Sequence, residues 1–171
     1  MRRLLLPVMA AAFALGLAAC SSTSSSSAAT GSSTGTSGGA SVPAVANATN
    51  LQVAPVVSAG TPPAPTSLVT KDLVVGTGTT AAASNTVVVQ YVGANYANGQ
   101  TFDSSWVRGS PATFPLSGVI PGFAQGIVGM KIGGRREIVI PPAEGYGASG
   151  QPPAVGPNET LVFVVDLVGV Q

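Results

Sequence analysis

The chain contains no histidine and only one cysteine among its 171 residues. Without histidine, neither a Ser-His-Asp triad nor a Cys-His pair can be assembled, and a lone cysteine cannot form a disulfide within the chain. The acidic residues are scattered along the sequence, with no close pair and no spacing typical of a metal site. The sequence therefore argues against hydrolytic chemistry, and we expect neither a metal nor a cofactor.

Charged residues are also scarce, at 8% of the chain. Lys131, Arg135 and Arg136 form the one basic cluster in the sequence. It is far too small for the phosphate-neutralising surface that nucleic-acid binding requires. We therefore expect no nucleic-acid partner and interpret the cluster as the solvated end of a strand.

The N-terminus has the pattern of a secretory signal, with basic residues followed by an apolar segment. Arg2 and Arg3 precede an apolar run from Leu4 to Ala19. This run is shorter than the roughly 20 apolar residues that a membrane-spanning helix needs. We therefore predict that residues 1–19 are a signal peptide that is removed.

The single cysteine follows this signal directly. Leu17-Ala18-Ala19-Cys20 resembles a bacterial lipobox, whose cysteine thiol receives the lipid. The alternative is an ordinary secretory signal with an unrelated cysteine. Because several acyl chains together anchor a protein stably, the resemblance implies a lipoprotein of the bacterial cell envelope. It would be held at Cys20 on the extracytoplasmic side of a membrane.

A long segment without charge follows the cysteine. Residues 21–66 consist mainly of Ser, Thr, Gly, Ala, Asn and Pro and show no sustained period of 2 or 3.6. Such a composition buries too little apolar surface to offset the entropy of ordering. We therefore predict a disordered tether over residues 20–66 and a folded domain over residues 67–171.

Within residues 67–171, short apolar segments alternate with turns. Strands are expected over residues 71–75, 86–92, 135–140 and 161–170. Asn98-Gly99 is a strong tight-turn signal and predicts a hairpin between residues 91–96 and 100–103. A single helix is expected from Pro121, with Gly129 stopping it. The predicted fold is α+β, with a mostly antiparallel, strongly twisted sheet wrapping one short helix.

Five motifs of this domain resemble, in family order, the FKBP-type peptidyl-prolyl cis-trans isomerases. They are Val89-Gln90-Tyr91-Val92-Gly93, Phe102-Asp103-Ser104-Ser105, Val119-Ile120-Pro121-Gly122-Phe123, Glu144-Gly145-Tyr146-Gly147 and Thr160-Leu161-Val162-Phe163. The resemblance implies an FKBP-like fold and a cofactor-free isomerase that assists the folding of exported proteins. It also implies a monomer that binds proline-containing polypeptides and ligands of the macrolide immunosuppressant type.

The resemblance further implies a pocket for a proline ring. Its substrate-binding residues would be Tyr91, Phe102 and Phe163 as walls, Phe123 as the floor, and Val119, Ile120, Tyr146 and Val155 as the border. Three of the implied residues would be catalytic: the Ile120 amide and the Tyr146 hydroxyl would hold substrate carbonyls, and Asp103 would lie beside the pocket, near the Tyr91 hydroxyl and Arg108.

The sequence departs from the family pattern at three places. Phe123 stands where animal members carry tryptophan, Ala112 stands where many have an aromatic residue, and Ala154-Val155 replaces a larger isoleucine pair. A smaller border should weaken the grip on residues flanking the proline. The alternatives to an isomerase are a non-catalytic proline-peptide-binding or holdase module and a purely structural lipoprotein. For Asp103, the alternative is a carboxylate that caps a turn.

Overall fold

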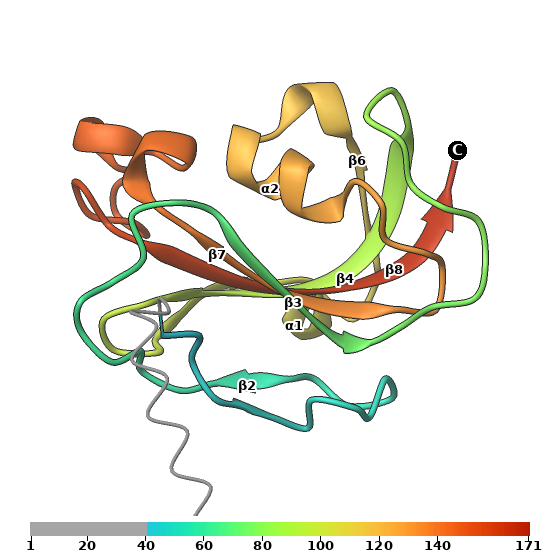
Figure 1. Ribbon diagram of the computed structural model, residues 1–171, viewed down its shortest axis with the longest axis horizontal. Helices are drawn as coiled ribbons and strands as arrows, with labels where there is room; N and C mark the ends of the chain where they lie inside the picture. The colour runs from blue at the N-terminus through green and yellow to red at the C-terminus, as the bar shows by residue number, and fades with distance from the viewer. Residues whose placement is uncertain (1–40) are drawn as a thin grey trace, which may run out of the picture. The chain divides into compact units, whose positions relative to one another are not determined.

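A six-stranded antiparallel sheet runs through the computed structural model, which describes residues 41–171 (Figure 1). In chain order its strands are β3 (Val69–Val74), β4 (Thr86–Asn95), β5 (Thr101–Ser104), β6 (Ala112–Pro115), β7 (Arg135–Ile140) and β8 (Leu161–Val170). The spatial order is β3-β7-β8-β4, and the far side of β4 pairs with β6 along its first half and with β5 along its second half. The expected mostly antiparallel sheet is confirmed.

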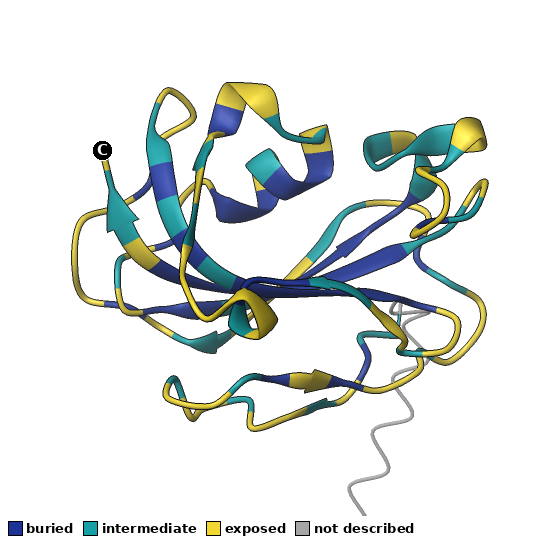
Figure 2. Ribbon diagram, turned by 180° about the vertical axis from the view of Figure 1, so that it is seen from behind, coloured by how far each residue is buried: buried dark blue, intermediate teal, exposed yellow. Residues whose placement is uncertain are grey.

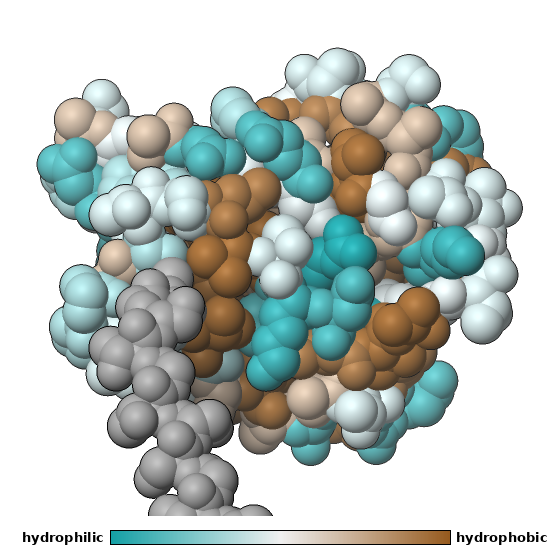
Figure 3. All heavy atoms as spheres, in the orientation of Figure 1, coloured by the Kyte–Doolittle hydropathy of each residue, from teal (hydrophilic) through white to brown (hydrophobic). Residues whose placement is uncertain are grey.

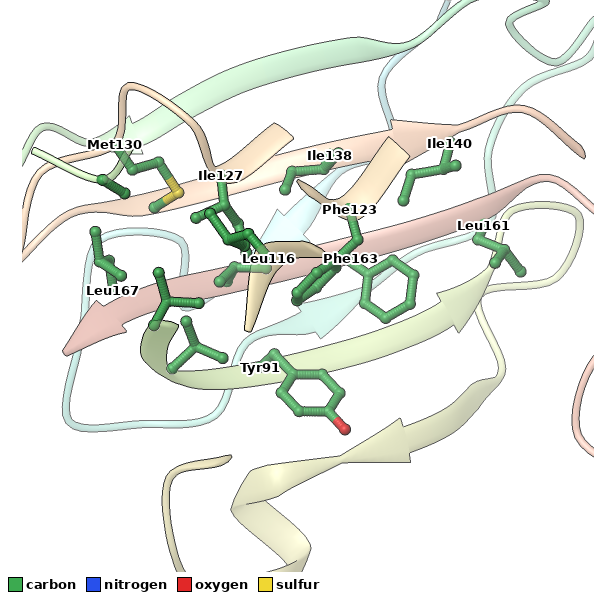
Figure 4. Packing of buried hydrophobic residues seen from close by; sticks show 14 of the residues in the cluster. Tyr91, Leu116, Phe123, Ile127, Met130, Ile138, Ile140, Leu161, Phe163 and Leu167 are labelled. Atoms are coloured by element: carbon green, nitrogen blue, oxygen red, sulfur yellow. The ribbon is translucent and has the colours of Figure 1, made fainter. Parts of the chain in front are cut away.

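The front face of the sheet, as we call the face under α2 (Pro121–Ile127), carries the main hydrophobic core. Pro121 begins the helix, where its missing N–H costs nothing, and Gly129 follows the helix with a φ of 84°. Figure 4 shows Phe123 and Ile127 of this helix among side chains from β7 and β8. Four further segments are short: α1 (Ser105–Arg108), η1 (Leu116–Gly118), η2 (Pro142–Glu144) and η3 (Gly147–Ser149).

The expected and observed elements differ mainly around β6. Strands β7 and β8 have the predicted bounds, and β4 and β5 form the predicted hairpin. Neither α1 nor β6 was expected. Pro111 directly precedes β6 and Pro115 is its last residue, and proline removes a donor from a ladder. Proline is tolerated here because β6 lies at the edge of the sheet, paired with β4 alone.

The back face of the sheet is covered by residues 41–66, which we call the N-terminal strap. The strap contains β1 (Val45–Ala46) and β2 (Val56–Val57), which pair with each other in an antiparallel ribbon. Figure 1 shows this ribbon on the side of the sheet opposite α2. Val57 is 5% exposed and packs in a second apolar cluster with Val92, Val139, Val162 and Val164. The central strands are therefore buried on both faces (Figure 2).

The prediction of a disordered tether is wrong for residues 41–66. The Tyr96 hydroxyl lies 2.9 Å from the Ser41 carbonyl and 2.8 Å from the Thr61 carbonyl, and the Gly60 N–H donates to the Tyr96 carbonyl at 2.7 Å. The strap has too few apolar residues to form a core alone, but the back of the sheet supplies the remaining apolar surface. The predicted signal peptide, Cys20 and residues 20–40 lie outside the described residues.

Arg135 fixes the strap to the sheet. It is fully buried, and its guanidinium donates to both carboxylate oxygens of Asp166, at 2.5 and 2.6 Å. The same guanidinium donates to the Asn47 carbonyl at 2.6 Å and to the Val53 carbonyl at 3.2 Å. The arginine that the sequence placed at a solvated strand end is therefore a buried anchor, because the strap covers that end.

Glu137 is a second charged residue beneath the strap. It is 1% exposed, and neither of its carboxyl oxygens has a hydrogen-bond partner among the described residues. Lys71 lies opposite it on β3, Val164 lies opposite it on β8, and the Arg135–Asp166 pair follows along the same strands. Burial raises the pKa of Glu137 from 4.5 to about 7, with the charge of Lys71 opposing the rise.

This raised pKa predicts that stability falls as the pH increases. Between pH 4.5 and 7 the folded protein holds a proton on Glu137 that the unfolded chain has released, so each step upward in pH favours unfolding. Glu137→Gln removes this dependence and should stabilise the domain by roughly 3 kcal/mol at pH 8, with little effect at pH 4. Urea unfolding of both proteins at the two pH values measures this difference. A constant difference at both pH values would contradict the prediction.

The surface carries its apolar residues in separate groups. On the face shown in Figure 3, hydrophobic side chains are divided by hydrophilic ones. The exposed large hydrophobic residues come from distant segments: Val53, Val56, Val75, Val107, Val128 and Val168. Among residues 41–171, no helix has both the length and the apolar character to cross a membrane.

Candidate active site

Five aromatic rings from five different elements meet on the front face of the sheet. They are Tyr91 of β4, Phe102 of β5, Phe114 of β6, Phe123 of α2 and Phe163 of β8. The ring centroids of Phe123 and Phe163 are 5.0 Å apart, and those of Phe102 and Phe163 are 5.6 Å apart, both edge to face. Such pairs favour this arrangement electrostatically. Figure 4 shows the Tyr91 hydroxyl pointing away from the aliphatic core.

Gly93 makes room for two of these rings. A Cβ built at this position would lie 2.8 Å from the Phe102 ring and 2.8 Å from the Phe163 ring, closer than real Cβ contacts. Register places Gly93 opposite Phe163 on β8 and opposite Asp103 on β5. The absence of a side chain at Gly93 therefore leaves room for both phenylalanine rings, packed edge to face, to close one side of the site.

The rings enclose an open cavity of about 350 Å³. Its lining includes eight residues expected from the sequence: Tyr91, Phe102, Asp103, Val119, Ile120, Phe123, Tyr146 and Phe163. Val155 was expected at the border, but it is 2% exposed and packs in the core beneath these residues, outside the lining. Loop 145–160 thus contributes Tyr146 and Gln151 to the cavity and keeps Val155 as internal support.

Three lining residues were missed by sequence reasoning: Phe114, Gly118 and Gln151. Phe114 lies in β6, whose burial alternates along residues 112–115, so this short alternation is the signal that could have found it. Gly118 ends η1, immediately before Val119, and offers only backbone to the cavity. The only sequence signal for Gln151 was its position near Ala154-Val155, the pair with smaller side chains than the family pattern.

Asp103 belongs to a polar group at the cavity edge. It accepts hydrogen bonds from the Tyr91 hydroxyl and from the Arg108 guanidinium, and Arg108 also donates to the Tyr91 hydroxyl at 2.8 Å. Burial alone would raise the pKa of Asp103, but these hydrogen bonds outweigh burial and lower the pKa below its ordinary value. Asp103 is therefore a carboxylate at neutral pH, held by two donors.

The arrangement of α1 explains how Arg108 reaches this group. Ser105, fully buried at the start of α1, accepts a hydrogen bond from the Tyr91 N–H at 2.8 Å and donates to the Gln90 side chain. This contact fixes the helix to β4, and one helical turn then places Arg108 over the Tyr91 ring, 5.4 Å from its centroid. Burial, followed by the bond to Asp103, raises the pKa of Tyr91 to about 12. Tyr91 thus keeps its proton.

Two hydrogen-bond donors at the cavity remain free. Within residues 41–171, the Ile120 N–H has no hydrogen-bond acceptor, although the Ile120 carbonyl accepts from Phe123 and Ala124 at the start of α2. The Tyr146 hydroxyl likewise has no hydrogen-bond partner among these residues. Burial, and then the charge of Asp103, raises the pKa of Tyr146, so its hydroxyl remains a donor. The cavity thus combines apolar walls with two donors that a ligand's carbonyl groups could use.

Comparison with known proteins gives a consistent result. The family described as FKBP-type peptidyl-prolyl cis-trans isomerase matches residues 77–168. The chain is 47% identical over 106 residues to a probable FK506-binding protein of Corynebacterium glutamicum, covering 62% of this chain and 89% of the relative. It is 48% identical over 114 residues to the FK506-binding protein of Streptomyces anulatus, covering 65% and 90%.

A solved structure agrees with this comparison. The crystal structure of FkpA from Escherichia coli is 44% identical, with a TM-score of 0.58, over 61% of this chain and 48% of the FkpA chain. This chain therefore spans about half of the FkpA structure. The family match covers more than half of the present sequence. The chain belongs to the FKBP-type peptidyl-prolyl cis-trans isomerase family and is an enzyme that interconverts cis and trans X–Pro bonds.

Proposed function

We propose that the aromatic cavity is the catalytic site, where a substrate's prolyl ring lies against Tyr91, Phe102 and Phe163 and above Phe123. The observation that carries this proposal is the cavity of about 350 Å³, walled by aromatic rings and bordered by two free donors. Rotation about an X–Pro bond is slow because twisting removes the amide resonance. The planar amide is also more polar than the twisted one. An apolar, water-excluding site therefore disfavours the planar ground state relative to the twisted state.

Two lining groups would guide the twist. The Ile120 N–H and the Tyr146 hydroxyl can each donate to a substrate carbonyl, and Val119 closes the border beside them. A hydrogen bond that forms best in the twisted geometry lowers the barrier, whereas one that is equal in both states does not. Asp103 would act by holding Tyr91 in place and by presenting negative charge to the cavity. No bond is made or broken in this reaction.

The substrates are proposed to be proline-containing polypeptides that are folding after export. Uncatalysed prolyl isomerisation takes tens to hundreds of seconds and can limit folding. Two relatives are named FK506-binding proteins, which supports macrolides of the FK506 type as ligands of the same cavity. Three Arg–Asp pairs, one buried, one partly buried and one exposed, neutralise charge on residues 41–171. We expect the domain to act as a monomer.

The test is the refolding of a reporter protein whose slow phase is limited by prolyl isomerisation. Residues 41–171 lie within one compact unit and serve as the enzyme in this assay. Catalytic amounts should accelerate the slow phase and leave the fast phases unchanged. An unchanged slow phase would contradict the proposed function.

Lipid anchoring is a separate part of the proposal. The signal-like residues 1–19 and the lipobox-like Leu17-Ala18-Ala19-Cys20 support it. A lipid at Cys20 would hold the enzyme on the extracytoplasmic side of a bacterial membrane. Cys20→Ser removes the thiol that would carry the lipid and should release the protein from the membrane fraction. Fractionation and metabolic labelling with an acyl precursor measure the change, with Ser21→Ala as a control that should stay anchored and labelled. Labelling that persists in Cys20→Ser would contradict lipidation.

A further inference from the structure

A second cavity shares Phe102 with the aromatic cavity. It has a volume of about 340 Å³, and we call it the polar cavity. Its walls come from the end of β4, the β4–β5 turn with the start of β5, and residues 153–159. Figure 1 shows the turn and this loop at the same end of the sheet. Phe102 is the one residue that lines both cavities.

The polar cavity lies next to the catalytic site along strand β4. Side chains two residues apart on a strand share a face, so Asn95 follows Tyr91 and Gly93 on the front of the sheet. The partners on β8 repeat this order, since Gly93 lies opposite Phe163 and Asn95 lies opposite Leu161. A polypeptide whose proline occupies the aromatic cavity could therefore pass Phe102 and place a neighbouring side chain in the polar cavity.

Asn95 brings an unpaired polar group to this cavity. It is 8% exposed, and its side-chain oxygen has no hydrogen-bond partner within residues 41–171. A buried polar group without a partner costs free energy. The oxygen itself is nearly inaccessible, so it can accept a hydrogen bond from a ligand only when the Asn95 side chain turns toward the cavity.

Glu159 brings a negative charge to the same cavity. One carboxylate oxygen accepts a hydrogen bond from the Gly156 N–H at 2.7 Å, which fixes the loop, and the other oxygen has no hydrogen-bond donor among the described residues. Glu159 is also in no ion pair within residues 41–171, whereas Asp72, Asp103 and Asp166 each pair with an arginine. No basic residue lines the polar cavity.

We propose that the polar cavity is a specificity subsite for a lysine or arginine side chain of the bound polypeptide. The cation would pair with the Glu159 carboxylate and, once the Asn95 side chain turns toward the cavity, would donate to its oxygen. The aliphatic stem of the side chain would lie along Phe102. An acidic side chain would be repelled by Glu159, and an apolar one would leave Asn95 unpaired. This inference rests on the proposed use of the aromatic cavity for proline.

The test uses short alanine-based peptides that contain one proline. Lysine is placed in turn at each of three positions before and three positions after the proline, and each peptide has a partner with uncharged norleucine at the same position. kcat/KM is measured by isomerisation kinetics, and affinity is measured by calorimetry. At one position, lysine should raise kcat/KM about tenfold over norleucine, which is the size of one charge-assisted hydrogen bond.

The decisive variant is Glu159→Gln, because glutamine keeps an oxygen for the Gly156 N–H and loses only the charge. In this variant the lysine peptide should fall to the level of its norleucine partner, while the norleucine peptides stay unchanged. Glu144→Gln is the matched control, since it also removes one carboxylate but lines neither cavity, and it should retain the lysine preference.

The subsite would be overturned by the absence of a lysine preference at every position, or by a preference that survives in Glu159→Gln. Equal loss of the lysine preference in Glu144→Gln would also overturn it, because the preference would then depend on the net charge of the protein and not on Glu159. If no peptide is turned over but calorimetry still finds the Glu159-dependent lysine preference, the subsite stands and the isomerase function fails. The two failures are therefore distinguishable.

Discussion

Replacing Phe102 and Tyr146 together by alanine is expected to lower kcat/KM for prolyl isomerisation by at least about 100-fold, or roughly 2.7 kcal/mol of transition-state stabilisation. Phe102 forms one wall of the aromatic cavity, and Tyr146 supplies one of its two free donors. Without the wall, water enters beside the prolyl ring, and without the hydroxyl, a substrate carbonyl loses its partner. The two losses affect the same bound proline.

The double variant should remain folded, because both side chains are only partly buried at the cavity edge. Val107→Ala is a suitable control. Val107 lies on α1 next to Arg108, yet it is 87% exposed and lines neither cavity, so its activity should match that of the unchanged protein. Near-ultraviolet circular dichroism checks the fold of both variants, and the refolding assay measures activity. A folded double variant that accelerates refolding as well as the unchanged domain would disprove the assignment of the site.

The largest effect on stability is expected from Arg135→Met. This change leaves Asp166 buried without its cation and removes the donors to the Asn47 and Val53 carbonyls of the strap. Breaking a buried pair from one side typically costs about 3–5 kcal/mol, because the remaining charge is uncompensated. Urea unfolding of residues 41–171 should show a loss of this size. The m-value shows whether the strap remains docked, because it scales with the surface exposed on unfolding.

The neighbouring arginine offers a matched control. Arg136 also donates to both oxygens of an aspartate, Asp72, and to the Gly126 carbonyl at 3.0 Å, but Asp72 is 44% exposed and keeps no buried charge when its partner is lost. Arg136→Met should therefore cost only about 1 kcal/mol. In the double variant Arg135→Met, Asp166→Leu, most of the loss should be recovered, because no unpaired buried charge remains. Equal losses for the two single variants would contradict the anchoring role of Arg135.

The sequence was a good guide wherever one local pattern determined the structure. Strand β8 could be delimited because its apolar run is long, and α2 because Pro121 begins it and Gly129 follows it. The cavity residues Tyr91, Phe102 and Phe163 were found through motifs and not through periodicity. Val155 was misplaced because its direction depends on how loop 145–160 folds back, which no local pattern determines.

The strap was missed because its order depends on a distant surface. Its own residues lack period and charge, so they resemble a disordered linker when considered alone. One signal was present in β8, where Val162 and Val164 alternate with Leu161 and Phe163, so that both faces of the strand are apolar. A strand that is apolar on both faces is buried on both faces. The chain therefore had to provide a second cover, and the segment before β3 was available for it.

If the protein is held by its N-terminus, as proposed above, the position of the strap has a mechanical consequence. A force applied at that end reaches the domain through the strap. The first hydrogen bonds that fix the strap to the sheet include those of Tyr96 and Arg135. Both contacts are on the back of the sheet, while the aromatic cavity opens on the front. Tension on a tethered molecule would thus act first on the contacts between the strap and the back of the sheet. The aromatic rings around the proline would not bear this force.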